Sequence, residues 1–356
     1  MLNTFTEQLA AGVALGPQQV TAAVAALVDE SVMAEIKAAF LTALAQKGET
    51  TEEIAAFAIE LRDRSVPVPL DAETRAREIL DVCGTGGDRL NTFNISTTVA
   101  LVCAAAGVTV AKHGNRAITS QSGSADVLEA LGVPVELSPE QAAASLRSHG
   151  FAFLFAPRFH PAFKHIGPAR RLCAERGQRT IFNFLGPLLN PARPSAQLIG
   201  VPRPELCGPM AKVLQSLGVR RGMVVCGEVP SSKLKVKGPE GTAFLDELST
   251  LGETTVAEFY HERGFAVSKL SPRDFPLQPA ALADLAGGDK HENAEIIRQV
   301  LGGRERGPKR DAVLMNAGAA LFLAGSAKSF AGGWSLAEEL LGTGVGVAKL
   351  ADLTRR

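Results

Sequence analysis

The chain has 356 residues, and its 37 basic residues (Lys and Arg) equal its 37 acidic residues (Asp and Glu) in number. This length favours two domains, or a small domain beside a large one. Apolar residues make up 46% and charged residues 21%, as in an ordinary soluble enzyme. A neutral balance gives no global field that would attract nucleic acid or an acidic membrane, so any anion site must be built locally.

Targeting and redox signals are absent from the sequence. The N-terminus lacks a basic start followed by an apolar stretch, so no secretion signal is expected. No uncharged apolar run reaches about 18 residues, so no membrane span is expected. The five cysteines form none of the close pairs that zinc sites or thiol redox motifs need. We therefore expect buried thiols in a reducing cytoplasm.

Residues 1–64 are predicted to be helical. Apolar positions recur at helical spacing in VTAAVAALV and MAEIKAAFLTAL, and Thr50 or Thr51 is placed to cap a further helix that begins at Glu52. The segment Val66-Pro67-Val68-Pro69 cannot continue a helix and predicts a stiff connector. We expect a helical domain over 1–69 and an α/β domain over 70–356.

After residue 76, short apolar runs alternate with helical patterns. The predicted strands are ILDVC, VTVAK, AFLFA, QLIGV and MVVCG, and the helices between them include ISTTVALVCAAAG, SADVLEALG, PEQAAASLRSHG and LCGPMAKVLQSLG. Strands of this length with helical crossovers predict an α/β fold with a mainly parallel sheet flanked by helices. Ligands in such sheets bind beyond the carboxyl ends of the strands.

The first predicted strand runs into a glycine-rich loop, Gly84-Thr85-Gly86-Gly87-Asp88. Glycines allow positive φ and let backbone N–H groups approach a ligand closely, although such a loop can also be only a turn. The spacing fits neither a dinucleotide fingerprint nor a Walker loop. Asn94-Ile95-Ser96-Thr97 then opens a helix, with Asn94 placed to cap it. A helix N-terminus suits a phosphate group.

The second predicted strand ends in Lys112-His113-Gly114-Asn115-Arg116, and a polar stretch leads to Ser124, a predicted cap of the next helix. Small polar neighbours around basic residues are typical of a polyanion cradle, although basic clusters are more often solvated faces. Further along, Asp246-Glu247 forms an adjacent acidic pair. Such a pair usually faces solvent, but Mg²⁺ at a phosphate site needs one or two carboxylates.

The blocks GTGGD, TFNIST, KHGNRAITSQSGSADVLEALG, RTIFNFLGPLLNP and DELS resemble the anthranilate phosphoribosyltransferases. Weaker matches at KGETTEEIA, HENAEIIRQVL and LMNAGAALFLAG extend the resemblance over nearly the whole chain. It implies a small N-terminal helical domain joined to a large α/β domain, as in pyrimidine nucleoside phosphorylases. It also implies that residues 160–180 pack against the helical domain, and that two chains form a homodimer through that domain.

The resemblance implies transfer of the phosphoribosyl group of phosphoribosyl pyrophosphate (PRPP) to the amino group of anthranilate. The products are N-(5-phosphoribosyl)anthranilate and pyrophosphate, a step of tryptophan biosynthesis. Two Mg²⁺ ions would be held by Ser96, Asp246 and Glu247, and anthranilate would meet Gly84, Asn115 and Arg170. The implied PRPP contacts are Gly84, Gly87, Asp88, Thr92, Asn94, Ile95, Ser96, Thr97, Lys112, His113, Gly114, Asn115, Arg116, Ala117, Ile118, Thr119, Ser120 and Ser124.

Three features depart from the family pattern. Residues 171–178 are about three residues longer than usual, so either Arg170 or Arg171 could meet the anthranilate carboxylate. Residues 228–245 are also extended, and SKLKVKGPEG predicts an extra hairpin before the acidic pair. Phe163 stands where the family commonly has methionine. None of these departures removes an implied catalytic group.

The aniline nitrogen is a weak nucleophile, so we expect an oxocarbenium-like transition state in which the protein positions the reactants and neutralises the leaving group. No strong base is needed, and His113 could accept the released proton or simply lie against the anthranilate ring. One rival function is a nucleoside phosphorylase, which would need a nucleobase pocket. Another is a non-catalytic paralogue that binds nucleic acid or another anion, which would be basic overall and would have lost the acidic pair.

Overall fold

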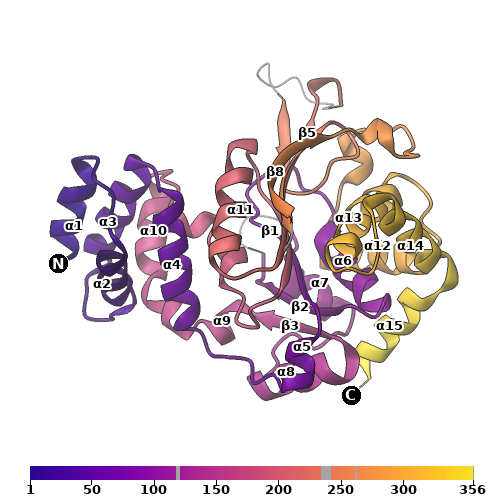
Figure 1. Ribbon diagram of the computed structural model, residues 1–356, viewed down its shortest axis with the longest axis horizontal. Helices are drawn as coiled ribbons and strands as arrows, with labels where there is room; N and C mark the ends of the chain where they lie inside the picture. Colours follow the sequence, from indigo (N-terminus) through magenta and orange to yellow (C-terminus); the bar gives the residue numbers. More distant parts are fainter. Residues whose placement is uncertain (118–120, 234–241, 261–262, 356) are drawn as a thin grey trace.

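The computed structural model describes residues 1–117, 121–233, 242–260 and 263–355, and Figure 1 shows a helical domain beside a larger α/β domain. The predicted fold class is confirmed: the larger domain holds a mostly parallel sheet with helices on both faces. The predicted extra hairpin at SKLKVKGPEG falls almost entirely within 234–241, outside the described residues.

Four helices form the N-terminal domain: α1 (Leu2–Ala10), α2 (Pro17–Val28), α3 (Ala34–Lys47) and α4 (Thr51–Asp63). Thr50 caps α4, because its hydroxyl accepts from the Glu53 N–H and the Glu53 carboxylate accepts from the Thr50 N–H. The buried Glu53 carboxylate also accepts from the Leu15 N–H at 2.9 Å and from Lys47 Nζ at 2.6 Å. This one side chain therefore ties α3, α4 and the loop before α2 together.

The sheet has the strand order β3-β2-β1-β4-β5-β7-β8, with β6 also paired to β5. The five predicted strands appear as β1 (Ile79–Gly84), β2 (Thr109–Gly114), β3 (Phe151–Phe155), β4 (Ala196–Gly200) and β5 (Arg221–Val229), all parallel to their neighbours in this set. Three further strands pair antiparallel: β6 (Ala243–Leu245), β7 (Thr254–Tyr260) and β8 (Arg263–Leu270). The antiparallel edge was not predicted.

Helices cover both faces of the sheet (Figure 1). The α-helices of this domain are α5 (Ala72–Ala76), α6 (Ile95–Ala105), α7 (Ser124–Ala130), α8 (Pro139–His149), α9 (Ala156–Phe159), α10 (Gly167–Glu175), α11 (Cys207–Ser216), α12 (Lys290–Leu301), α13 (Pro308–Leu323), α14 (Phe330–Thr343) and α15 (Val345–Thr354). Successive residues of β5 show the two faces, because Met223 and Val225 join the apolar cluster of α6, α7 and α12–α15, whereas Val224 and Cys226 join that of α11 and the helical domain.

Helix α10 leaves the α/β domain and lies among the helices of the N-terminal domain (Figure 1). It packs against α3, and its residues Ala169 and Cys173 belong to the same apolar cluster as Leu41 and Leu44 of α3. The short 3₁₀ helix η1 (Pro161–His165) leads into α10 and contacts α2. The two domains are therefore joined by shared core packing in addition to the connector.

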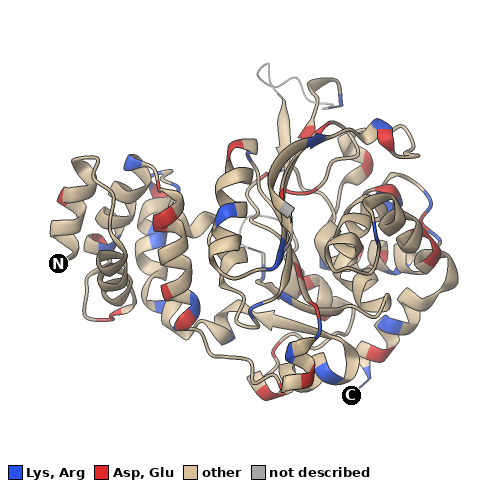
Figure 2. Ribbon diagram, in the orientation of Figure 1, with Lys and Arg blue, Asp and Glu red and all other residues tan. Residues whose placement is uncertain are grey.

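Charged residues of both signs are interspersed along the helices of both domains (Figure 2). This distribution accords with the neutral overall balance and leaves any anion site to local geometry. Within the described part of the chain, no helix is long and apolar enough to cross a membrane.

Candidate active site

The acidic pair lies across the carboxyl ends of two adjacent parallel strands. Gly84 ends β1 and Gly200 ends β4, and a Cβ atom added at either glycine would overlap Asp246. Beyond β1, the backbone N–H of Gly86 donates to Oδ2 of Asp246 at 2.7 Å. Only glycine at both strand ends lets the loop that carries Asp246 settle this close to the sheet.

The second carboxylate of the pair meets the N-terminus of α6. The Ser96 N–H, in the first turn of α6, donates to Oε1 of Glu247 at 3.1 Å. Lys112 is buried at the end of β2, and its Nζ donates to the Val82 carbonyl at 2.6 Å and to Oγ of Ser96 at 3.4 Å. The glycine loop, the start of α6, the end of β2 and the acidic pair therefore converge, although about 150 residues separate Ser96 from Glu247.

Three carboxylates share this small region. Burial, and then the neighbouring Asp88 carboxylate, raises the pKa of Asp246 to about 7. Burial, and then Asp246, raises the pKa of Glu247 well above its usual range, and burial also raises the pKa of Asp88. Carboxylates that burial and mutual repulsion make costly to ionise are stabilised by a bound cation, so their chemistry fits Mg²⁺.

The side chains that the structure describes do not form a metal cage by themselves. Among the described residues, no group of three or more His, Cys, Asp or Glu side chains could hold a metal ion by itself. Mg²⁺ typically takes one or two carboxylates from the protein and completes its shell with substrate phosphates and water. Asp246 and Glu247, with the Ser96 hydroxyl nearby, fit that incomplete donor set.

Gly123, just before α7, lies against the backbone that follows β2. A Cβ atom at Gly123 would overlap the backbone of 116–117, and Oδ2 of Asp126 accepts from both the Ala117 and Gly123 N–H groups. Ser124 was predicted to cap α7, but Gly123 is the cap residue and Ser124 is the first helical residue, with its hydroxyl donating to the Asn115 carbonyl. The capping prediction was therefore wrong, because Asp126 already supplies the acceptor.

Asn94 precedes α6 as predicted, but its side chain makes no capping hydrogen bond. Instead, Oδ1 of Asn94 accepts from Nδ2 of Asn293 on α12 at 3.0 Å, and its Nδ2 donates to the Ser122 carbonyl at 3.3 Å. In the first turn of α6, the Ile95 N–H donates to the Phe93 carbonyl and the Ser96 N–H donates to Glu247. Thr92 lies just before, where its backbone pairs with Ala286.

The Arg116 side chain, a predicted PRPP contact, already has acidic partners. Its guanidinium pairs with Asp126, Glu129 and Glu136, and it lies over the Phe155 ring. Three acidic partners neutralise this cation on the side of α7. The Ala117 N–H is likewise taken by Asp126, so neither group is free to hold an anion in this arrangement.

The remaining predicted PRPP contacts lie in three kinds of place. Ile95 and Thr97 lie in the first turn of α6 and are buried. Gly87 and Asn115 are exposed at the rim, and Gly114 is half-buried beside Ser124. Ile118, Thr119 and Ser120 lie outside the described residues.

A row of aromatic rings links the end of β2 to α10. The His113 ring lies 5.2 Å from that of His160, which lies 5.1 Å from Phe163. Phe163 packs edge-on against Phe182 at 5.7 Å, and the guanidinium of Arg170 lies 5.4 Å from the Phe182 ring centre. This row of mutually tilted rings, with a cation at one end, offers ring contacts and a charge partner to a small aromatic carboxylate.

Arg170 and Arg171 differ clearly in environment. Arg170 is half-buried, burial lowers its pKa, and no carboxylate of the described residues pairs with it. Arg171 is exposed on the same helix. Because an unpaired, partly buried guanidinium favours an anionic partner, this geometry favours Arg170 over Arg171 as the contact for the anthranilate carboxylate.

His113 is buried, and burial followed by the neighbouring His160 lowers its pKa to about 3. Its Nδ1 lies 3.2 Å from the Gly186 carbonyl, whereas its buried Nε2 has no hydrogen-bond partner among the described residues. Such an imidazole stays neutral near pH 7 and is a weak proton acceptor. The geometry therefore favours packing against the acceptor ring over general base catalysis.

Both domains of the chain match known protein families. Residues 3–65 match the helical bundle domain of a glycosyl transferase family, and residues 76–347 match its a/b domain. The anthranilate phosphoribosyltransferase of Geobacter sp. (strain M21) is 46% identical over 327 residues, which are 89% of this chain and 87% of that protein. The chain belongs to the anthranilate phosphoribosyltransferase family.

Solved structures of the family share the fold. The enzyme from Thermus thermophilus is 41% identical, with a TM-score of 0.85 and 98% of each chain covered. The enzyme from Saccharomyces cerevisiae in complex with PRPP and Mg is 29% identical, with a TM-score of 0.83, and covers 99% of this chain and 96% of its own. The same yeast enzyme also has a structure in complex with 4-fluoroanthranilate.

Some residues that shape this family site were not predicted. Asp81, fully buried in β1, accepts from the His113 N–H and from Nδ2 of Asn190, and burial raises its pKa to about 6. Asn316 on α13 exchanges two hydrogen bonds with the backbone of Leu248, next to Glu247. A polar residue inside an otherwise apolar strand or helix pattern was the only sequence signal for either.

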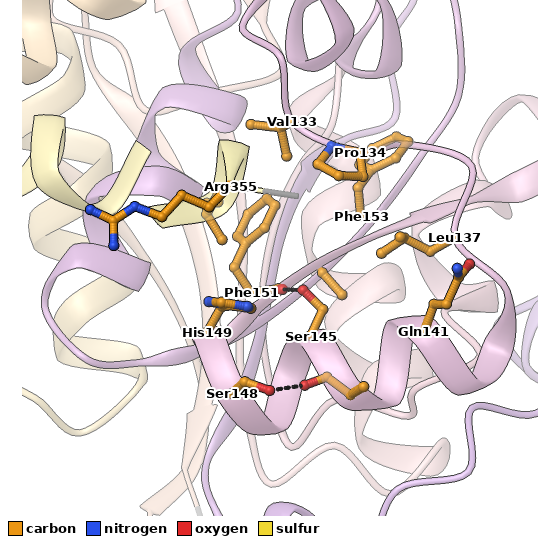
Figure 3. Close-up of a pocket in the computed structure, with 13 residues that line it drawn as sticks. Val133, Pro134, Leu137, Gln141, Ser145, Ser148, His149, Phe151, Phe153 and Arg355 are labelled. Carbon is orange, nitrogen blue, oxygen red and sulfur yellow. Dashed lines mark hydrogen bonds between the residues drawn. The ribbon is translucent and has the colours of Figure 1, made fainter. Parts of the chain in front are cut away.

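A separate cavity of about 240 Å³ lies between α8, the start of β3 and the end of α15 (Figure 3). Val133, Leu137, Phe151 and Phe153 give it an apolar lining. None of the predicted family site residues lines it, and it lies at the amino end of β3. Ligands of parallel sheets bind at the opposite, carboxyl ends, so this cavity is not the active site.

Because Asp246 lies so close to the end of β4, one methyl group added at Gly200 should lower the activity. Gly200→Ala would push the Asp246 backbone off the strand end, because the new Cβ would overlap it. We expect kcat/KM to fall by about 10²-fold, as for loss of one key charge-stabilising group, with little change in far-ultraviolet circular dichroism. Gly342→Ala is the matched control, since a Cβ there meets nothing. Equal activity of the two variants would contradict this arrangement.

Proposed function

We propose that this chain transfers the phosphoribosyl group of PRPP to the amino group of anthranilate and releases pyrophosphate, as its family relatives' name states. One observation carries the proposal: the Asp246-Glu247 loop lies against the glycine loop and the N-terminus of α6. Carboxylates for a metal and N–H donors for phosphate are thus brought to one place. A nucleoside phosphorylase would need a nucleobase pocket, and the family match favours the transferase.

The metal would be Mg²⁺, held by Asp246, Glu247 and the Ser96 hydroxyl, and it would stabilise the negative charge that develops on pyrophosphate. The yeast relative was solved with PRPP and Mg, and we propose two ions, as the family resemblance implies. The glycine loop and the start of α6 would offer N–H groups to the diphosphate. Buried Lys112 would add a positive charge beneath them.

The acceptor would lie along the aromatic row, with its carboxylate on Arg170 and its amino group toward the PRPP rim. A planar guanidinium can give two parallel hydrogen bonds to a carboxylate and so fixes the ring's orientation. The ammonium formed by attack is strongly acidic and releases its proton to water readily. His113, neutral and buried, would pack against the ring.

We further propose a cytoplasmic homodimer that forms through the helical domain. All five cysteines are free, which suits a reducing compartment. Met1, Val13 and Met33 expose large apolar side chains on the helical domain, as a surface that pairs with a second copy would. Sedimentation velocity at micromolar concentration checks the oligomer: the proposal requires twice the mass of one chain, and a monomer would refute it.

The activity is tested by the fluorescence of anthranilate. On mixing with PRPP, Mg²⁺ and the purified protein, we expect anthranilate fluorescence to disappear with time, and we expect chelation of Mg²⁺ to stop the loss. Uridine or thymidine with inorganic phosphate serves as the parallel substrate set. Phosphorolysis of either nucleoside, with anthranilate unchanged, would replace the proposed function by the rival one.

Asp246→Asn combined with Glu247→Gln removes two negative charges but keeps the oxygens that accept from Gly86 and Ser96. We expect kcat to fall by about 10²-fold or more, because the metal loses its carboxylates while the loop keeps its place. Steady-state rates across a range of Mg²⁺ concentrations measure the effect. Normal rates at every Mg²⁺ concentration would reject the metal assignment.

Arg170→Ala should raise the KM for anthranilate by about 10- to 100-fold, the equivalent of one charged hydrogen-bonded pair, with the KM for PRPP nearly unchanged. Arg171→Ala is the matched control, because Arg171 is the exposed neighbour on the same helix. Equal changes in both Michaelis constants, or the larger effect from Arg171→Ala, would remove Arg170 from the acceptor site.

A further inference from the structure

Lys37, in the middle of α3, is a lysine inside the protein core. Only 1% of its surface is exposed, and no carboxylate of the described residues forms an ion pair with it. Lysine is rarely buried so completely unless its ammonium is bound by other groups. Here two main-chain carbonyl oxygens accept hydrogen bonds from the ammonium. The residues that carry these carbonyls show which segments Lys37 holds together.

The two carbonyls that Lys37 binds belong to different domains. Its Nζ donates at 2.6 Å to the carbonyl of Asp29, the residue that follows α2, and at 2.9 Å to the carbonyl of His165, the last residue of η1. The first bond stays within the helical domain. The second crosses 128 residues of sequence to the segment that leads into α10.

That segment carries two members of the aromatic row, Phe163 and Arg170. Phe163, two residues before the bonded carbonyl, packs against Phe182, and Arg170, five residues after it, lies over the same ring. The carbonyl of His165 is therefore at the joint between η1 and α10. A shift of this joint would move Phe163 and Arg170 relative to Phe182.

We propose that Lys37 is a positioning residue for the acceptor half of the active site: its ammonium fixes the joint between η1 and α10 and thereby aims Arg170. The proposal rests on the function proposed above for Arg170. A charged donor gives stronger and more directional bonds to carbonyls than a neutral one, so the joint is held more firmly than by apolar packing alone. Burial lowers the pKa of Lys37, the cost of placing a charge at this position.

A purely structural role predicts a different result. The apolar cluster that α3 shares with α10, which includes Leu41 and Cys173, remains when the ammonium is lost, so the domains should stay together. If Lys37 only stabilises the fold, its removal should lower the melting temperature without a selective change in the KM for either substrate. If Lys37 positions Arg170, its removal should raise the KM for anthranilate and leave the KM for PRPP nearly unchanged.

The test is Lys37→Met, which keeps the length and apolar stem of the side chain. We expect the KM for anthranilate to rise about 5- to 10-fold, a loss comparable with one hydrogen bond, with kcat and the KM for PRPP within twofold of wild type. Glu53→Gln is the matched control, because it breaks the buried pair with Lys47 inside the helical domain. The same selective rise in Glu53→Gln, or none in Lys37→Met, would overturn the proposal. If Lys37→Met does not fold, Lys37→Gln is measured against the same outcomes.

A double-mutant cycle with Arg170→Ala tests the path of the effect. Because Lys37 is proposed to act through Arg170, Lys37→Met should add little to the anthranilate KM of Arg170→Ala. Multiplicative effects would overturn the proposal. The single variants distinguish the two proposals. An unchanged KM for anthranilate in Arg170→Ala rejects Arg170 as the acceptor contact. A raised KM for anthranilate in Arg170→Ala, with a normal one in Lys37→Met, rejects only the role of Lys37.

Discussion

The site depends on the contact between one loop and the ends of two strands. Asp246 can lie over β1 and β4 only because Gly84 and Gly200 have no side chain, and the Gly86 N–H then holds its carboxylate. Glu247 follows at once and meets the start of α6. Without this contact, the carboxylates would lie apart from the N–H groups that suit a phosphate.

This contact explains how a chain with no net charge can handle a highly charged substrate. The site is built locally: buried carboxylates with raised pKa values would hold a cation, and buried Lys112 supplies positive charge. Arg116, which could have added positive charge at the rim, is instead neutralised by three acidic partners. The proposed acceptor site is the aromatic row with Arg170, in which Phe163 and Arg170 both lie against Phe182.

Much of this arrangement could be predicted because its signals are local. Glycines after a predicted strand and polar residues at a helix start are recognisable within a few residues of sequence. In a parallel sheet, the carboxyl ends of successive strands lie at the same edge. Long-range partners have no such signal. Asn293 donates to the Asn94 side-chain oxygen, which therefore does not cap α6, and Asp126 accepts from the Gly123 N–H in place of a Ser124 cap. Likewise, nothing near Lys37 in sequence indicates that its partner is the carbonyl of His165.

The central claim is that Asp246 and Glu247 bind the metal together with the diphosphate of PRPP. Its most direct test replaces Mg²⁺ with Mn²⁺ and follows the relaxation rate of water protons as PRPP is added to the protein. We expect a ternary complex of protein, Mn²⁺ and PRPP in the wild type and its loss in the Asp246→Asn, Glu247→Gln protein. An equally strong ternary complex in that double variant would contradict the account.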